Sequence, residues 1–344
     1  MNRRMSMGMF LAIVVPLVVA LVGLSLSQGY ITVSFADLSR ALAASLGWGE
    51  PLAEDQQTTI IAIRLPRILI AVFGGAALAV AGTIMQAVFR NPLASPEILG
   101  TAQGSALGAT VAIALGWASV STFWMPVSAV VGALIVTGLV YGIAGGTKGF
   151  SVASLLLAGI AMNTLVGALI ALAISRLSYD DWGQGSQILF WLMGNLDSTR
   201  AADAAVVGVA MVVGIACVVP FLREMDLMTL KDEGASALGV NVVVVRSVLL
   251  LIACGLTALT VAFTGGIAFI GLVVPHMARL VVGPVHRKLV PCAAVLGSLM
   301  FVGSDYLCRV LFPDSGLRVG VVMSMLGAPF FLYLLVRIRR GQRL

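Results

Sequence analysis

The chain has 344 residues, of which 60% are hydrophobic and only 10% are charged, and its mean hydropathy is +1.05. Soluble globular domains carry about 25% charged residues, so these proportions exclude a soluble enzyme or binding module and indicate a polytopic membrane protein. The net charge of +6 does not indicate nucleic-acid binding, because the placement of the cations follows the pattern that orients membrane proteins. We therefore expect membrane lipid, and no nucleic acid, around the chain.

Apolar runs separated by short polar segments predict an all-α fold with ten membrane-spanning helices in one domain covering residues 1–344. The predicted spans are 9–28, 65–89, 97–116, 122–143, 151–175, 202–221, 242–263, 267–282, 289–309 and 317–338. A cleaved signal peptide is the alternative for the first span, but no small-x-small cleavage motif leads into a polar segment, which favours an uncleaved helix. Only the division of 97–143 into two spans is open, with Gly116 and Pro126 in the expected turn.

An even number of spans places both termini on one side of the membrane. If the N-terminus is cytoplasmic, 14 of the 21 Lys and Arg residues face the cytoplasm and 7 face outward. This bias predicts a multi-pass protein of the cytoplasmic (inner) membrane with both termini in the cytoplasm. The seven outward cations need a separate explanation, since the rule disfavours them; they are Arg40, Arg64, Arg67, Arg176, Arg200, Arg309 and Arg318.

Two loops carry amphipathic segments. The long external loop 29–59 contains helical spacing over 35–46. The cytoplasmic loop 223–241 contains the segment 227–239, with Asp226 as its expected N-cap and Gly239 as its expected C-terminal stop. A short amphipathic helix on the cytoplasmic side is a natural docking element for another protein.

Catalytic motifs are absent from the sequence. It contains no G-x-x-x-x-G-K-[ST] phosphate loop and no H-E-x-x-H zinc motif. Its two histidines and four cysteines do not have metal-ligand spacing, so neither a metal nor a cofactor is predicted. Ion-coupled carriers usually keep ionisable groups or broken helices near the middle of the membrane, and the predicted spans have almost none. Energy for transport is therefore expected from another chain, with an ATP-independent carrier or a structural subunit as the alternatives.

Short motifs in a fixed order resemble the permease subunits of ATP-binding-cassette (ABC) importers for iron–siderophore complexes, haem and cobalamin (FecCD-type, type II importers). The series begins with Arg64-Leu65-Pro66-Arg67, Gly82-x-x-Met85-Gln86, Arg90-Asn91-Pro92-Leu93-Ala94 and Pro96-x-x-Leu99-Gly100. It continues with Leu155-Leu156-Leu157-Ala158-Gly159, Phe190-Trp191-Leu192-Met193-Gly194, Leu238-Gly239-Val240, the segment 266–279, His286-Arg287 and Gly327-Ala328-Pro329. Each motif is short, but their order along nearly the whole chain is specific.

The resemblance implies an assembly in which this chain is not itself an enzyme. Two ten-span permease subunits, identical or paralogous, enclose the path, two ATPase subunits hydrolyse ATP, and a periplasmic substrate-binding protein delivers the ligand. The segment Phe190–Gly194 is more similar to the siderophore members, so an iron–siderophore is the expected cargo. Cobalamin and haem remain the alternatives.

The resemblance also implies roles for the two ends of the molecule. Arg64, Arg67 and Arg309 match the arginines that meet glutamates of the binding protein. The alternatives are pairing with lipid headgroups or within the chain, since Asp305 precedes Arg309 by one helical turn. Residues 227–239 match the coupling helix that contacts the ATPase, with an ordinary connector as the alternative; the coupling residues are Leu230, Lys231, Asp232, Glu233, Gly234, Ala235, Ser236, Leu238 and Gly239.

The fifth and tenth spans are implied to line the path. Its candidate residues are Met162, Asn163, Met323, Ser324 and Met325, and the candidate cytoplasmic gate is Ser151, Val152, Ala153 and Ser154. Methionine and small residues offer few fixed hydrogen bonds, which suits a bulky ligand in transit. Ordinary helix packing is the alternative for each of these residues.

Overall fold

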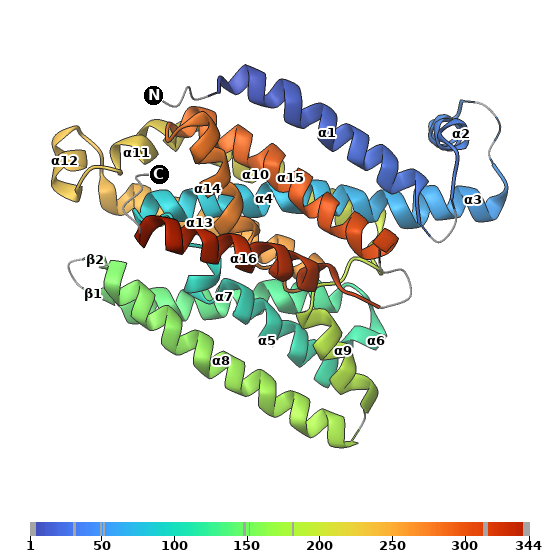
Figure 1. The fold of residues 1–344 in the computed structure, drawn as a ribbon. Coiled ribbons are helices and arrows are strands. Elements are labelled where there is room, and N and C mark those ends of the chain that lie inside the picture. The colour runs from blue at the N-terminus through green and yellow to red at the C-terminus, as the bar shows by residue number, and fades with distance from the viewer. Residues whose placement is uncertain are drawn as a thin grey trace.

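The computed structural model describes residues 5–29, 32–48, 50, 52–146, 149–150, 152–180, 182–311 and 316–339. Its long helices lie side by side as an elongated bundle (Figure 1). The elements are α1 (Met7–Ser27), α2 (Phe35–Ser45), α3 (Glu54–Thr58), the π-helical η1 (Thr59–Arg64), α4 (Leu65–Val88), η2 (Pro96–Leu99), α5 (Thr101–Ala114), α6 (Trp117–Val120), α7 (Trp124–Ala144), β1 (Gly145–Gly146), β2 (Gly149–Phe150), α8 (Val152–Asp180), α9 (Trp182–Leu192), α10 (Ala201–Val218), η3 (Val219–Phe221), α11 (Leu222–Leu227), α12 (Asp232–Ala237), α13 (Val242–Thr264), α14 (Ile270–Val282), α15 (His286–Leu311) and α16 (Val319–Arg339).

Each predicted span corresponds to a helix, so the all-α fold class is confirmed; the only strands in the described residues are the two-residue pair β1 and β2. Seven helices of the described chain are long and apolar enough to cross a membrane, and α14 and α16 add two shorter apolar helices. The remaining span is α5, and α7 follows it after the short α6, which resolves the open division of 97–143 into two helices. Helix α1 begins and α16 ends at the end of the bundle that carries α12 (Figure 1).

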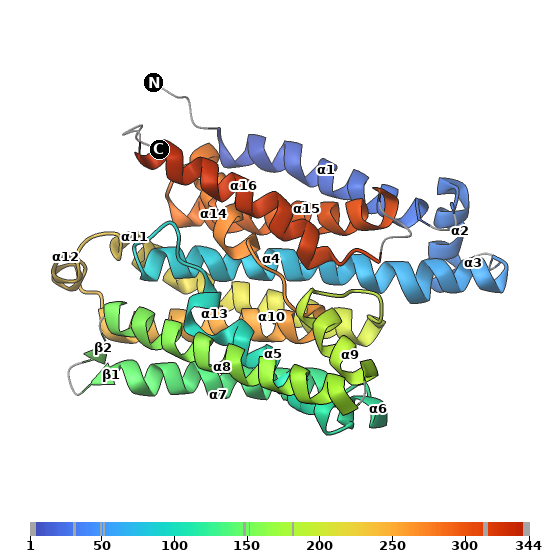
Figure 2. The same ribbon diagram turned by 60° about the horizontal axis from the view of Figure 1, so that its bottom comes forward.

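Helix α4 runs through the middle of the bundle, with α14 and α15 on one side and α10 and α13 on the other (Figure 2). Most of its residues are buried, from Gly74 to Val88 without a break. A Cβ atom added to Gly82 would lie 1.8 Å from the backbone oxygen of Gly271 in α14. The backbones of α4 and α14 therefore touch directly, as small residues allow in membrane proteins.

The helix that contains Arg64-Leu65-Pro66-Arg67 begins earlier than predicted. The sequence placed its start at residue 65, whereas α3, η1 and α4 follow one another from Glu54 to Val88. Pro66 has no backbone N–H to continue the ordinary hydrogen-bond pattern, and the π-helical turn of η1 lies just before it. The motif thus begins ten residues, or nearly three turns, inside a longer helix.

The longest helix that was not predicted is α9. Residues 182–192 form α9, which follows α8 after a sharp change of direction and lies across the end of α5 and α8 (Figure 1). Its hydrophobic run is too short for a span, which is why the hydropathy pattern does not reveal it.

Candidate functional site

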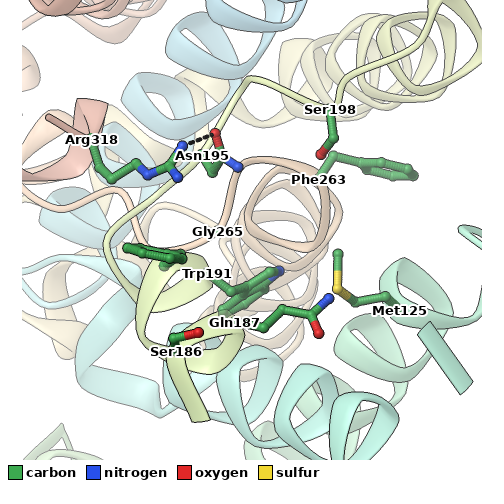
Figure 3. A pocket seen from close by; sticks show the side chains of 10 residues that line it. Met125, Ser186, Gln187, Trp191, Asn195, Ser198, Phe263, Gly265 and Arg318 are labelled. Carbon is green, nitrogen blue, oxygen red and sulfur yellow. Dashed lines mark hydrogen bonds between the residues drawn. The ribbon is translucent and has the colours of Figure 1, made fainter. Parts of the chain in front are cut away.

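A pocket of about 240 Å³ opens at the end of the bundle opposite α12, which we call the arginine end (Figure 3). Side chains from α7, α9 and α13, the segment after α9 and Arg318 before α16 line it. Among its ten described lining residues Arg318 is the only charged one, and its guanidinium lies 4.9 Å from the ring centre of Phe190. Arg318 and Asn195 lie at one edge of the pocket and Gln187 at the opposite edge (Figure 3).

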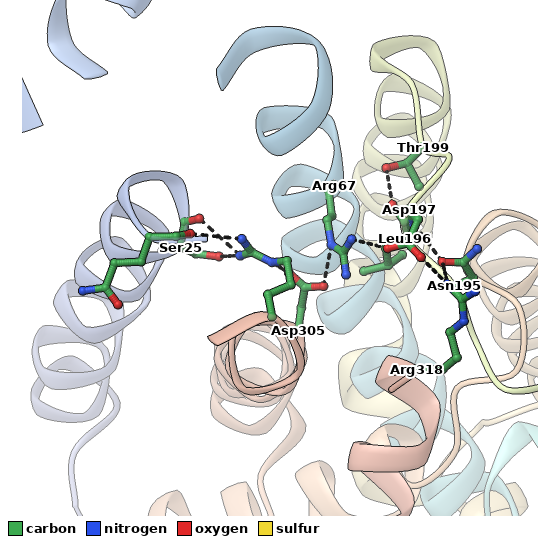
Figure 4. Close-up of polar contacts among 10 residues, drawn as sticks. Ser25, Arg67, Asn195, Leu196, Asp197, Thr199, Asp305 and Arg318 are labelled. Atoms are coloured by element: carbon green, nitrogen blue, oxygen red, sulfur yellow. Dashed lines mark hydrogen bonds and ion pairs between the residues drawn. The ribbon is translucent and has the colours of Figure 1, made fainter. Parts of the chain in front are cut away.

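Three arginines and two aspartates are joined by ion pairs at the same end (Figure 4), and a fourth arginine, Arg64, lies close to Arg309; we call these six residues the arginine network. Its members are Arg64, Arg67, Asp197, Asp305, Arg309 and Arg318. It joins α1, α4, α15, the segment 195–199 and the start of α16. Four positive and two negative charges leave these six side chains with a surplus of two positive charges.

Asp305 is the centre of the arginine network. Its carboxylate is fully buried and accepts from Nε of Arg67 at 2.7 Å and from Nε of Arg309 at 3.0 Å. Arg67 also pairs with Asp197, whose other carboxylate oxygen pairs with Arg318. One buried carboxylate and one more exposed carboxylate therefore hold three arginines from three separate segments in place.

Arg64 and Arg309 attach the network to the end of α1. Arg64 is buried and donates to the backbone oxygen of Leu26 at 2.7 Å. Arg309 donates to the backbone oxygens of Ser25 at 3.2 Å and Gln28 at 3.3 Å. Cations at a helix C-terminus satisfy carbonyl groups that have no partner inside the helix. Both arginines therefore have intramolecular partners, and Arg64 is buried.

The predicted coupling segment forms a shorter helix than expected. Helix α12 covers Asp232–Ala237, and residues 228–231 before it form a turn. Asp226 is not the N-cap, because its carboxylate accepts the backbone N–H of His286 at 2.9 Å and lies 2.6 Å from Nδ1 of that histidine. Gly239, with a φ of +85°, does end the helix, and its N–H donates to the backbone oxygen of Ser236 at 2.9 Å.

Two arginines hold α12 against the bundle, and we call this contact the Asp232 clamp. Nη2 of Arg246, at the start of α13, donates to both carboxylate oxygens of Asp232, at 2.9 and 3.1 Å. Arg90, just beyond the end of α4, also pairs with Asp232 and donates to the backbone oxygen of Met228 at 2.5 Å. Partial burial by itself raises the pKa of the Asp232 carboxyl. Hydrogen bonds from Arg90 and Arg246, together with their positive charges, outweigh this effect and hold the pKa below its ordinary value.

Two exposed leucines flank α12. Leu230 and Leu238 expose 45% and 55% of their surface, whereas Ala235 between them is fully buried against the bundle. Of the other predicted coupling residues, Gly234 is half-buried, and the exposed ones are Lys231, Asp232, Glu233, Ser236 and Gly239. The clamp therefore fixes one side of the helix while two leucines project from the molecule.

The predicted path residues differ in exposure. Met323 is fully buried, and its sulfur accepts a hydrogen bond from Ser304 at 2.8 Å, so packing accounts for it in this chain. Met325 is exposed, and Ser324 donates to the backbone of its own helix. Met162 and Asn163 are half-buried, and the Asn163 amide donates to the backbone oxygen of Glu97 at 3.1 Å. Of the gate residues, Val152 is half-buried, Ala153 and Ser154 are exposed, and Ser151 lies outside the described residues.

Comparison with known proteins decides the family. Residues 17–337 match the model of the FecCD transport family. The chain belongs to this family. The resemblance carried by the sequence motifs is therefore confirmed, and the protein is an ABC importer permease and a multi-pass protein of the inner membrane. Membership of a transport family is consistent with the prediction that this chain is a transport subunit and not an enzyme. It also implies an ATPase partner.

The FecCD permease is similar to transporters with different cargoes. It is 40% identical to the cobalamin import system permease BtuC of Halobacterium salinarum, over 87% of this chain and 78% of the relative. It is 36% identical to the hemin transport permease HmuU of Yersinia pestis, over 100% and 99% of the two chains. A solved inward-facing structure of a metal-chelate type ABC transporter superposes with a TM-score of 0.83 at 28% identity, over 96% of this chain and 99% of that one.

Sequence reasoning missed several residues that build both ends of the FecCD permease. Asp197, Arg90 and Arg246 are central to the arginine network and to the Asp232 clamp, yet none was singled out for these roles. Asp197 lies in the polar segment 195–200 after an apolar run, which marks a loop but gives no partner. Arg90 lies in a motif of the resemblance, directly before Asn91-Pro92 at the end of a predicted span, and this position was the available signal.

Proposed function

We propose that this FecCD permease is the membrane subunit of an importer that carries a ferric chelate of the iron–siderophore class across the cytoplasmic membrane. Separate ATPase subunits supply the energy, and a periplasmic binding protein delivers the ligand at the arginine end. Both chain termini and α12 then face the cytoplasm. One arrangement supports this best: α4 carries Arg67 near one end, Arg90 lies two residues beyond its other end, and each belongs to a polar cluster suited to a different partner.

Docking of the binding protein rests on the charge of the arginine network. The network keeps two more positive than negative charges, and Arg67, Arg309 and Arg318 each retain some exposed surface. Acidic residues of a docking protein would be attracted by this surplus and would compete with Asp197 for Arg67. Arg64 then acts mainly by holding α1, and Arg67 and Arg309 form the contact itself.

Coupling to the ATPase rests on α12. Leu230 and Leu238 project from the molecule and suit an apolar cleft of a partner. A push on α12 passes through the Asp232 clamp to α4 and α13, because both clamping arginines lie at the ends of these helices. Such a rigid contact turns closure of the ATPase pair into movement of spanning helices, as alternating access requires.

A second permease subunit, identical or paralogous, is proposed to cover α8 and α16. Helix α8 exposes apolar side chains such as Leu157 and Ile160, and the same helix carries the half-buried amide of Asn163. An exposed apolar helix face of this kind suits the helix of a second subunit, which would also enclose a shared path. Ala153, Ser154, Met162, Ser324 and Met325 are the path and gate residues of this proposal.

Cobalamin or haem import is the second candidate function, supported by the cobalamin and hemin permeases among the relatives. The test is ATP-driven uptake by proteoliposomes that contain the permease with its ATPase and binding protein. Ferric trihydroxamate, ferric citrate, haem and cobalamin are offered in turn. We expect ATP-dependent accumulation of at least one ferric chelate and of neither haem nor cobalamin. Exclusive uptake of cobalamin or haem would replace the proposed cargo, and failure of the chain to copurify with an ATPase in mild detergent would remove the importer assignment.

A further inference from the structure

The pocket at the arginine end contains hydrogen-bond donors without acceptors. Arg318 uses Nη1 for Asn195, at 2.9 Å, and for Asp197, but its Nε atom is buried and has no partner among the described residues. The indole nitrogen of Trp191 has no hydrogen-bond partner in the described part of the chain either, but unlike Arg318 Nε it is not fully buried. A buried donor without an acceptor is costly, so such donors mark places where a ligand or water supplies the acceptor.

The guanidinium of Arg318 is held in one orientation. Its cation lies over the ring of Phe190, and Asn195 fixes one of its amino groups. The Asn195 side-chain oxygen is itself held by the backbone N–H of Asp197 at 2.8 Å. A stacked and hydrogen-bonded guanidinium keeps its remaining donors in a fixed plane, and that plane matches the two oxygens of a carboxylate.

Size and charge restrict what the pocket can hold. Its volume of about 240 Å³ is below the roughly 300–1,000 Å³ of pockets that enclose a drug-sized ligand. It therefore accommodates one arm of a larger molecule. No carboxylate is among its ten described lining residues. Asp197, which pairs with Arg318, lies outside this lining, and the arginine network as a whole keeps a surplus of positive charge, so an anionic oxygen group is favoured over a cation.

We propose that this pocket is an entry subsite that binds a carboxylate arm of the transported chelate through Arg318, with Trp191 as a second donor. The inference rests on the proposed function, since it places the ligand at the outer end of an import path. Arg318 directly precedes α16, so the subsite lies where a ligand released at the arginine end first meets this helix. A chelate without free carboxylates makes less use of the subsite.

Equilibrium binding to the assembled importer without binding protein or nucleotide tests the subsite. Ferric citrate is the carboxylate-bearing probe, and an uncharged ferric trihydroxamate is the neutral probe. We expect Arg318→Gln to weaken ferric citrate binding by about tenfold or more, because a hydrogen bond to a charged group is lost. Trp191→Phe keeps the aromatic ring but removes the indole N–H, and should weaken it by about threefold. Neither variant should change binding of the neutral probe.

The control is Arg200→Gln, which removes a positive charge at the same end but outside the pocket, where Arg200 donates to Thr122 at 2.7 Å. If Arg318→Gln and Arg200→Gln weaken ferric citrate binding equally, the subsite proposal is wrong, because the effect is then only long-range electrostatic attraction. Weaker affinity for the binding protein with unchanged ferric citrate binding would also overturn it and assign the pocket to docking.

If the wild-type importer takes up a chelate while both pocket variants bind all probes normally, the inference fails and the proposed function stands. If the wild type takes up none, the proposed function fails, and the citrate measurement still decides the pocket.

Discussion

The carboxylate of Asp305 accepts a hydrogen bond from Nε of Arg67 at 2.7 Å, although the two residues are 238 positions apart in the sequence. This contact joins the start of α4 to the end of α15, and Arg309 occupies the second carboxylate oxygen at 3.0 Å. Because Asp305 is completely buried, neither lipid headgroups nor a docking protein can replace these partners without movement of the helices. Asp305 is therefore structural, whereas the arginines around it also face outward.

Replacing Asp305 by Asn should destabilise the protein strongly. The change keeps the shape of the side chain but leaves Arg67 and Arg309 without their shared carboxylate, and loss of one partner of a buried ion pair costs about 3–5 kcal/mol. Thermal unfolding of the purified permease in mild detergent measures the effect. Asp37→Asn is the control, because Asp37 belongs to an exposed pair with Arg40 at 3.6 Å. Equal melting temperatures for the two variants would contradict the structural role of Asp305.

Replacing Asp197 by Asn should strengthen docking of the binding protein. The surplus charge of the arginine network rises from two to three, and Arg67 loses the internal partner that competes with an incoming carboxylate. We expect about threefold to tenfold higher affinity at low salt and a steeper fall with added salt. Arg67→Gln should do the opposite. The measurement is binding-protein affinity against salt concentration.

The control for docking is Arg40→Gln, which removes an exposed cation of α2 that lies outside the network. An increase in affinity for Asp197→Asn that is absent in Arg40→Gln supports docking at the network. If Asp197→Asn and Arg67→Gln both leave the affinity and its salt dependence unchanged, the binding protein docks elsewhere.

The two exposed leucines beside α12 should be required for ATPase binding. Leu230→Ser combined with Leu238→Ser removes apolar surface that nothing in the described chain covers, so the fold should persist while the ATPase is lost on purification. Leu46→Ser is the control, because Leu46 is an even more exposed leucine at the arginine end. Retention of the ATPase by the double variant would show that α12 is an ordinary connector.

Replacing Asp232 by Asn should separate ATP hydrolysis from transport. The variant loses the charge that holds Arg90 and Arg246, so α12 still meets the ATPase but no longer moves α4 and α13 rigidly. We expect ATPase activity within about twofold of wild type and chelate uptake reduced about tenfold or more. The ratio of uptake to hydrolysis in proteoliposomes is the measurement. An unchanged ratio would contradict a mechanical role for the clamp.

The Asp232 clamp also predicts that the ratio of chelate uptake to ATP hydrolysis does not depend on pH near neutrality. The pKa of Asp232 is depressed in the folded protein, so the stabilisation from its pairing is fully present above the ordinary value of about 4 and is lost only as the pH falls through the folded-state pKa. Between about pH 5.5 and 8 the ratio of uptake to hydrolysis should therefore stay constant. A fall of this ratio within that range that disappears in Asp232→Asn would place the titration at the clamp and contradict the depressed pKa.

The sequence predicted the spans well because hydropathy is a local property. Each apolar run became a helix, and Gly239 ended α12 as expected, since a glycine stop is read from neighbouring residues. Polar pairing between distant segments is not local. Asp226 has the right chemistry for an N-cap, but His286 lies next to it in space and takes its carboxylate. For the same reason Asp197 and Arg246 became visible only when the helices were placed beside one another.

Replacing Gly82 by Ala should disrupt the bundle at its centre. The new methyl group would lie 1.8 Å from the backbone oxygen of Gly271, so α4 and α14 must separate. We expect a lower melting temperature in detergent and lower yield. Gly138→Ala is the matched control, because Gly138 is a helical glycine of α7 with nothing within 4 Å of an added Cβ, and alanine there should stabilise by about 0.5–1 kcal/mol. Similar stability of both variants would contradict the close approach of α4 and α14.

The most direct test of the account is the source of energy for uptake. The permease is reconstituted in proteoliposomes alone and, separately, with its ATPase and binding protein, and accumulation of ferric chelates is measured with ATP inside or with an imposed proton or sodium gradient. We predict accumulation only in the complete assembly and only with ATP. Accumulation by the permease alone, driven by an ion gradient, would contradict the claim that α12 receives the force for transport from a separate chain.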